Sequence, residues 1–143
     1  MAAVQKLVLI EHPAERMFEL VDRVEDYPLF LPWCISTRLI QRTEAITAAT
    51  LHVSYRGIRT QFSTENDKEP PRHMRIRLVD GPFHHLLGSW HFTPLGETAC
   101  KIEFSLSWAF SNKVLERALG PVFGHIANTL MDSFVERANR LGL

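Results

Sequence analysis

Histidine is the side chain here with the widest chemical use, because near neutral pH it can act as a general acid, a general base or a metal ligand. The sequence has seven histidines. His84 and His85 are adjacent, so they cannot easily face one metal ion, and no HExxH, CxxC or paired-carboxylate spacing occurs. Asp80, His91 and Tyr55 are too scattered to be recognised as a catalytic triad. We therefore assign no catalytic residue and no metal ligand, and we favour a binding protein over an enzyme.

Arginine is the other side chain with a specific chemistry, because its guanidinium group binds phosphate. Arginines alternate outward on neighbouring predicted strands, with one more in the adjoining turn, and the set is Arg56, Arg59, Arg75 and Arg77. One interpretation is a basic patch that contacts ribosomal RNA. The other is a solubilising outer face, whose charge is balanced by Glu65, Asp67 and Glu69.

A third chemistry is the binding of an apolar molecule. Several predicted strands and the last helix direct aromatic and aliphatic side chains to one side of the sheet. Most such faces form a solid core, but pockets for small molecules are also mostly apolar with few polar groups. The predicted cavity lining is Val53, Tyr55, Phe62, Ile76, Leu78, Trp90, Phe92, Phe104, Leu106, Trp108, Val122, Ile126 and Leu130.

Two segments with turn-like sequences also carry large apolar residues. Loops normally lie on the surface, where an exposed apolar patch often marks a binding site. One interpretation is a gate through which a lipid enters the cavity, and the other is a pair of loops that fold over the ends of the core. The residues concerned are Phe30, Leu31 and Trp33 in the first segment and Pro82 and Phe83 in the second.

The elements that must position these residues follow from composition and alternation. Strands are predicted over residues 4–10, 36–42, 46–55, 58–66, 74–79, 87–93 and 99–110. A helix beginning near Pro13 and a short second helix separate the first two strands. Because the later strands are joined by short turns, we expect an antiparallel meander of the α+β class, ordered as strand, two helices, six strands and a last helix.

The last strand leads directly into a long amphipathic helix. Ser111 and Asn112 are both good N-cap residues. Gly120-Pro121 predicts a kink or a break, since proline removes a helical hydrogen bond. A long helix in the hollow of a curved sheet can leave an apolar gap between the two layers. Its predicted buried face is Leu115, Leu119, Val122, Phe123, Ile126, Leu130, Phe134, Ala138 and Leu141.

The composition limits the remaining functions. The chain has 143 residues, 45% of them hydrophobic, which suits a single domain over residues 1–143. Its 16 basic and 16 acidic residues give a formal net charge of zero, so no global field attracts nucleic acid and we expect no DNA binding. No apolar run is long enough to span a bilayer. With two widely spaced cysteines and no import signal, we expect free thiols in a cytoplasmic protein that makes at most transient, peripheral contact with the inner membrane.

Two stretches carry a specific resemblance to a known family. They are VEDYPLFLPWC at residues 24–34 and LVDGPF at residues 78–83, the second followed by Leu87 and by Trp90-His91-Phe92. Together with the order of elements, they resemble the polyketide cyclase/dehydrase group of START-like proteins over the whole chain. That group includes coenzyme-Q-binding proteins and bacterial ribosome-association toxins. The resemblance implies the helix-grip (START/Bet v 1-like) fold, in which a curved antiparallel sheet of about seven strands surrounds the C-terminal helix.

The residues and the resemblance leave three functions open. The leading hypothesis is a protein that holds ubiquinone or another lipid between sheet and helix and supports respiratory electron transport, with no cofactor required. The alternative is a toxin-type translation inhibitor that binds the large ribosomal subunit and blocks subunit association. The third is a polyketide cyclase or aromatase, for which the sequence supplies no identifiable catalytic group.

Overall fold

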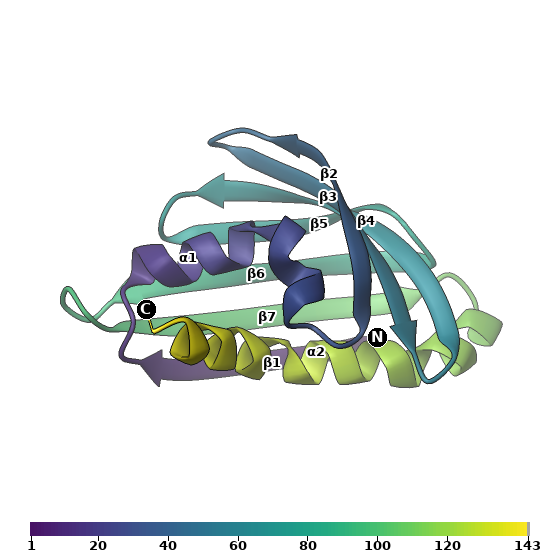
Figure 1. The fold of residues 1–143 in the computed structure, drawn as a ribbon. Helices are drawn as coiled ribbons and strands as arrows, with labels where there is room; N and C mark the ends of the chain where they lie inside the picture. Colours follow the sequence, from purple (N-terminus) through teal and green to yellow (C-terminus); the bar gives the residue numbers. More distant parts are fainter. Residues whose placement is uncertain (143) are drawn as a thin grey trace.

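The computed structural model describes residues 1–142 and confirms the predicted order of elements. No helix among these residues is both long enough and apolar enough to cross a membrane. The elements are β1 (Ala2–Ile10), α1 (Ala14–Asp22), the 3-10 helix η1 (Val24–Leu29), β2 (Cys34–Arg42), β3 (Ile46–Tyr55), β4 (Ile58–Glu69), β5 (His73–Asp80), β6 (Phe83–Pro94), β7 (Cys100–Phe110) and α2 (Lys113–Leu141) (Figure 1).

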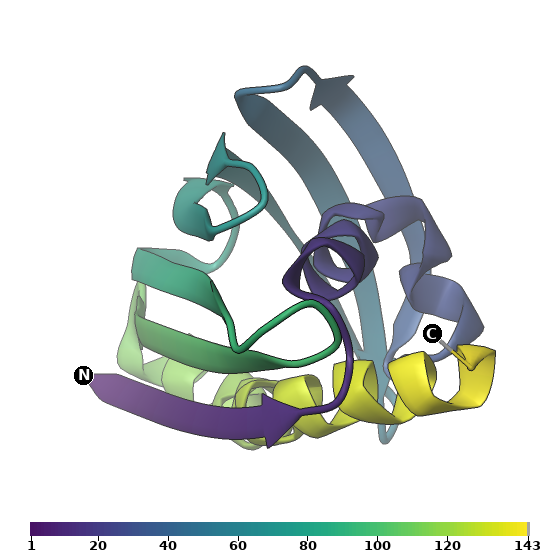
Figure 2. The same cartoon turned by 90° about the vertical axis from the view of Figure 1, so that its left-hand side faces the viewer.

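The strands form one antiparallel sheet of seven strands in the order β1-β7-β6-β5-β4-β3-β2. Strands β2 to β7 follow one another as a meander, and β1 joins at the far edge beside β7. The sheet curls around the helices α1 and α2 (Figure 2). The predicted α+β architecture, a curved antiparallel sheet with a long C-terminal helix, is therefore confirmed.

Alternation determines which side of each strand is buried. Along β7, every second residue from Cys100 to Trp108 is buried and the residues between them are partly exposed. Strand β6 begins at Phe83, whereas the sequence predicted a start near Leu87. A bulge after Phe83 explains the difference, because it lets this end of β6 keep pairing with Phe110 at the end of β7.

Strands β3 and β4 are joined by a tight turn of two residues, Arg56-Gly57, between the paired residues Tyr55 and Ile58. Both turn residues have positive φ, 49° at Arg56 and 81° at Gly57. This is the conformation of a type I′ hairpin turn, which glycine adopts without strain. The turn places Arg56 at the tip of the hairpin, where its guanidinium lies 5.3 Å from the centroid of the Tyr55 ring.

Helix α2 begins and ends as its sequence indicates. The Asn112 side chain accepts a hydrogen bond from the backbone N–H of Leu115 at 2.9 Å, which confirms the predicted N-cap. Gly142 follows the last turn with a left-handed φ of 69°. The helix runs through Pro121 without interruption, so a break into two helices is wrong. Pro121 and Arg117 are both exposed, so the hydrogen bond that proline removes lies on the solvent side of the helix.

The buried face of α2 matches most of the predicted stripe. Leu115 and Leu130 are half-buried, and Leu141, the last residue of the helix, is exposed. Ala127 and Met131 were not predicted but point into the core. The buried residues of α2 are Leu119, Val122, Phe123, Ile126, Ala127, Met131, Phe134 and Ala138.

Candidate functional site

A cavity of about 80 Å³ lies between the inner face of the sheet and the helices η1 and α2. It is much smaller than the several hundred Å³ (roughly 300 or more) of a typical site for a drug-sized ligand. The protein thus has a cavity where the sequence predicted one, with room for a small chemical group. Of the predicted lining residues, the structure brings together Phe62, Ile76, Trp90, Phe104, Leu106, Ile126 and Leu130.

Aromatic rings fill most of the hollow and explain the small volume. The ring centroid of Trp90 lies 4.4 Å from that of Phe104 and 5.5 Å from that of Phe134 on α2. Phe92, predicted to line the cavity, instead packs between Trp90 at 6.0 Å and Phe18 of α1 at 5.6 Å. Edge-to-face and stacked contacts of this kind stabilise a core beyond their burial alone.

The other predicted lining residues lie elsewhere in the core. Val53 and Val122 border a separate void of about 10 Å³, at the lower limit for one water molecule. A correct face on a strand or helix therefore does not ensure contact with the cavity. The remaining predicted residues outside its wall are the buried Trp108 and the half-buried Tyr55 and Leu78.

The two predicted gate segments fold over the core. Leu31, Trp33 and Phe83 are only 1%, 3% and 7% exposed. Phe30 and Pro82 are half-buried. These positions fit the interpretation that the loops cap the core. Trp33 has a further place that the sequence did not assign to it, since its side chain forms part of the cavity wall.

Polar residues on β4 are the part of the wall that sequence reasoning missed. The inner face of this strand runs from Phe62 through Thr64 and Asn66 to Lys68, and the first three line the cavity. Alternate polar positions on a core-facing strand were a usable signal, because burying a polar group is costly unless it is hydrogen-bonded. Further lining residues outside the predicted set are Val24, Tyr27, Leu51, Leu86 and Phe123.

Two polar atoms of the cavity residues have no hydrogen-bond partner within residues 1–142. They are Nε1 of Trp33 and Oδ1 of Asn66, and both are shielded from solvent. The Tyr27 hydroxyl differs, because it donates to the backbone carbonyl of Val21. Burial raises the pKa of this phenol above its usual range, so it stays protonated. The cavity is thus mostly apolar, and two fully shielded polar atoms in its lining residues, one donor and one acceptor, lack a partner.

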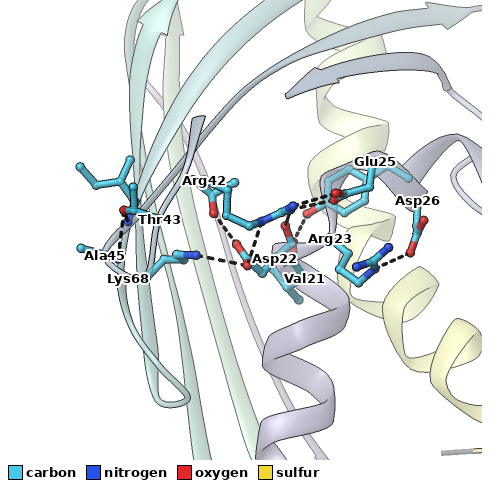
Figure 3. Close-up of polar contacts among 12 residues, drawn as sticks. Val21, Asp22, Arg23, Glu25, Asp26, Arg42, Thr43, Ala45 and Lys68 are labelled. Carbon is cyan, nitrogen blue, oxygen red and sulfur yellow. Dashed lines mark hydrogen bonds and ion pairs between the residues drawn. The ribbon is translucent and has the colours of Figure 1, made fainter. Parts of the chain in front are cut away.

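A network of charged residues joins the end of α1 and η1 to the sheet near this cavity, as Figure 3 shows. Asp22 accepts hydrogen bonds from Thr47 Oγ1 at 2.6 Å and from Lys68 Nζ at 3.2 Å. Arg42 donates to both carboxylate oxygens of Glu25 at 2.7 Å and to the backbone carbonyl of Asp22 at 2.7 Å. The Lys68 side chain is only 4% exposed, so the Asp22 carboxylate compensates a buried charge.

This network holds η1 in place and offers no obvious catalytic group. Hydrogen bonds from Arg42 lower the pKa of Glu25 from 4.5 to about 2, so this carboxylate is charged at neutral pH. Cys34 and Cys100 are separate free cysteines. Burial raises the pKa of each thiol to about 11, which leaves both protonated and weakly nucleophilic.

The predicted basic patch divides into two parts. Arg59 lies opposite Ser54 near the β3–β4 turn, whereas Arg75 lies opposite Asp67 near the other end of β4. Positions 59 and 67 are separated by about 26 Å along an extended strand. Arg77 is paired with Glu65 and Asp67, at 2.7 Å in each case. Two carboxylates therefore offset the half with Arg75 and Arg77, whereas within the described residues no ion pair involves Arg56 or Arg59 near the hairpin tip.

Comparison with curated proteins identifies relatives along almost the entire chain. The ribosome association toxin RatA of Escherichia coli K12 is 39% identical over 141 residues, which cover 99% of this chain and 89% of the relative. The protein of the same name from Vibrio cholerae is 40% identical, covering 99% of this chain and 98% of the relative. A mitochondrial coenzyme Q-binding protein, COQ10 homolog B of Xenopus laevis, is 25% identical over 89% of this chain and 54% of its own length.

Solved structures share the fold. An aromatase/cyclase named Zhui, from a Streptomyces species, superposes with a TM-score of 0.83 at 16% identity, covering 97% of this chain and 94% of that one. A START superfamily protein from Mycobacterium smegmatis gives a TM-score of 0.78 at 20% identity over 97% and 98% of the two chains. The family described as polyketide cyclase / dehydrase and lipid transport matches residues 10–135. This chain therefore belongs to the polyketide cyclase/dehydrase and lipid transport family.

Proposed function

We propose that this protein associates with the ribosome and inhibits translation by binding the large subunit. The observation that supports the proposal most is identity of 39–40% to ribosome association toxins along 99% of the chain. The small cavity adds to it, since about 80 Å³ leaves little room for a prenyl-quinone without rearrangement of the core. The quinone hypothesis, favoured from the sequence, therefore takes second place.

The separation of the four arginines into two pairs indicates which surface would contact the ribosome. Arg56 and Arg59 lie at and beside the tip of the β3–β4 hairpin, where a projecting turn can approach an RNA backbone. Arg75 and Arg77 lie beside Asp67 and Glu65, and these carboxylates would repel phosphate. The hairpin pair is therefore the better candidate for contact with ribosomal RNA.

Sedimentation of the purified protein with isolated large and small subunits, at two salt concentrations, tests the proposal. We expect binding to large subunits that weakens as salt rises. Arg56→Ser/Arg59→Ser should weaken binding and reduce its salt dependence, while the matched pair Arg75→Ser/Arg77→Ser should change both little. Absence of co-sedimentation at low salt would contradict the proposal. If the two double variants weakened binding equally, the hairpin would not be the specific contact surface.

A second candidate function is the binding of a hydrophobic ligand in the cavity. Its support is the mostly apolar wall with two unused polar atoms, together with the similarity to a coenzyme Q-binding protein. Organic extraction of the purified protein, followed by mass spectrometry, should then release a lipid or quinone in stoichiometric amount. A clean extract from protein that still binds large subunits would favour the ribosome alone.

A further inference from the structure

Two buried polar atoms of the cavity residues, Trp33 Nε1 and Asn66 Oδ1, have no hydrogen-bond partner within the described chain. Trp33 is 3% exposed and Asn66 is 8% exposed, so neither side chain is well placed to turn to bulk water. Burying a polar group without its hydrogen bond costs about 1–3 kcal/mol. Two such groups in the wall of one cavity indicate that the missing partners come from a molecule inside it.

Gly88 keeps this space open from the sheet side. A Cβ atom at this position would lie 2.7 Å from Leu106 Cδ1 and 3.3 Å from Ile76 Cδ1, and both of these side chains line the cavity. With no side chain on Gly88, Leu106 and Ile76 can lie against the strand. The same Cβ atom would also lie 2.8 Å from the backbone carbonyl oxygen of Ser105, so a larger residue would require these side chains or the neighbouring strand to move.

The chemistry of the two atoms limits what the occupant can be. An indole N–H only donates, and an amide oxygen only accepts. A hydrocarbon satisfies neither atom, and a ketone or quinone oxygen satisfies only the indole. A hydroxyl group offers an acceptor and a donor together. The Tyr27 hydroxyl cannot serve both atoms, because its proton is donated to Val21.

We infer that the cavity binds the hydroxyl-bearing end of a small apolar molecule, a phenol or an alcohol, through Trp33 Nε1 and Asn66 Oδ1. This inference rests on the second candidate function, the binding of a hydrophobic ligand. The volume of about 80 Å³ suits the polar end of such a molecule. The same volume would also hold water molecules, which are the competing occupant.

Phenol and toluene form a matched pair of probes, because they have nearly the same shape and differ in one hydroxyl group. Titration of the full-length protein, followed through the indole N–H signals in nitrogen-edited NMR spectra, distinguishes them. We expect phenol to bind saturably, about tenfold more tightly than toluene, and to shift the Trp33 signal downfield. Trp33→Phe assigns that signal by removing it.

Asn66→Leu removes the acceptor at nearly constant size and should reduce the preference for phenol to about threefold or less. Asn128→Leu, on the exposed side of α2, is the control and should leave the preference unchanged. Equal binding of phenol and toluene without a shift of the Trp33 signal would overturn the inference, but it would still support the binding of a hydrophobic ligand in the cavity. Binding of neither probe would overturn both, and water would then be the occupant.

Discussion

Lys68 and Asn66 lie two positions apart on the same inner face of β4, and both are buried, yet they differ in their partners. Lys68 reaches the Asp22 carboxylate. Asn66 Oδ1 reaches no partner within the described chain. Burial of a polar residue is therefore not by itself a sign of function. The paired group is part of the structure, whereas the unpaired one points to something that the chain alone does not supply.

The paired Lys68 and the unpaired Asn66 should also affect the free energy of unfolding in opposite ways. Asp22 joins α1 to β3 and β4 through Thr47 and Lys68, so removing its carboxylate would leave the buried Lys68 charge without a partner and destabilise the folded state. Asn66 contributes a desolvated oxygen without compensation, which lowers the free energy of unfolding. Substitutions in the two regions should therefore have effects of opposite sign.

The largest effect should follow from Asp22→Ala. It leaves the Lys68 ammonium group buried without a counter-charge, and breaking a buried ion pair costs about 3–5 kcal/mol. Urea denaturation measures the loss directly. The double variant Asp22→Leu/Lys68→Met is the control, since removing both charges should recover much of the stability. If Asp22→Ala lowered the free energy of unfolding by less than about 1 kcal/mol, the Asp22–Lys68 pair would be no stronger than a surface ion pair.

Asn66→Leu should raise stability in the absence of ligand. Leucine has a similar size and replaces an unpaired acceptor with apolar surface, so we expect a gain of about 1 kcal/mol in the same urea assay. Thr47→Val is a useful contrast, because it removes a paired group and should destabilise the protein. If Asn66→Leu were destabilising instead, the amide would have a structural role and the comparison with Lys68 would fail.

The smallest effect should be a pH dependence from Glu25. Its folded-state pKa of about 2 lies below the ordinary value of 4.5, chiefly because of the Arg42 hydrogen bonds. The ionised form is thus favoured by folding, so its stabilisation is complete above pH 4.5 and is lost as the pH falls toward 2. Melting temperatures of wild type and Glu25→Gln should converge over this range. Parallel curves would mean that Arg42 does not hold Glu25 in solution.

The sequence predicted the fold better than the site, for physical reasons. Alternation and capping are local, so residues 99–110 and Asn112 could be interpreted correctly without neighbours. Cavity volume is not local, because it depends on how far Trp90 and Phe134 reach across the hollow. Alternation also gives the face of an arginine but not its position along the paired strand. The separation of Arg59 from Arg75 therefore required the register of β4.

The position of β1 has a consequence for how the protein is made. Ala2 pairs with Trp108, and Ile10 pairs with Cys100, so β1 cannot form these pairs until β7 has been synthesised. Closing a loop of that length costs entropy before any contact repays it, and folding that depends on distant contacts is slow. While the middle of the chain is being synthesised, both β1 and the open edge of the meander lack their partners. We therefore expect the nascent protein to expose strand edges until β7 has been synthesised.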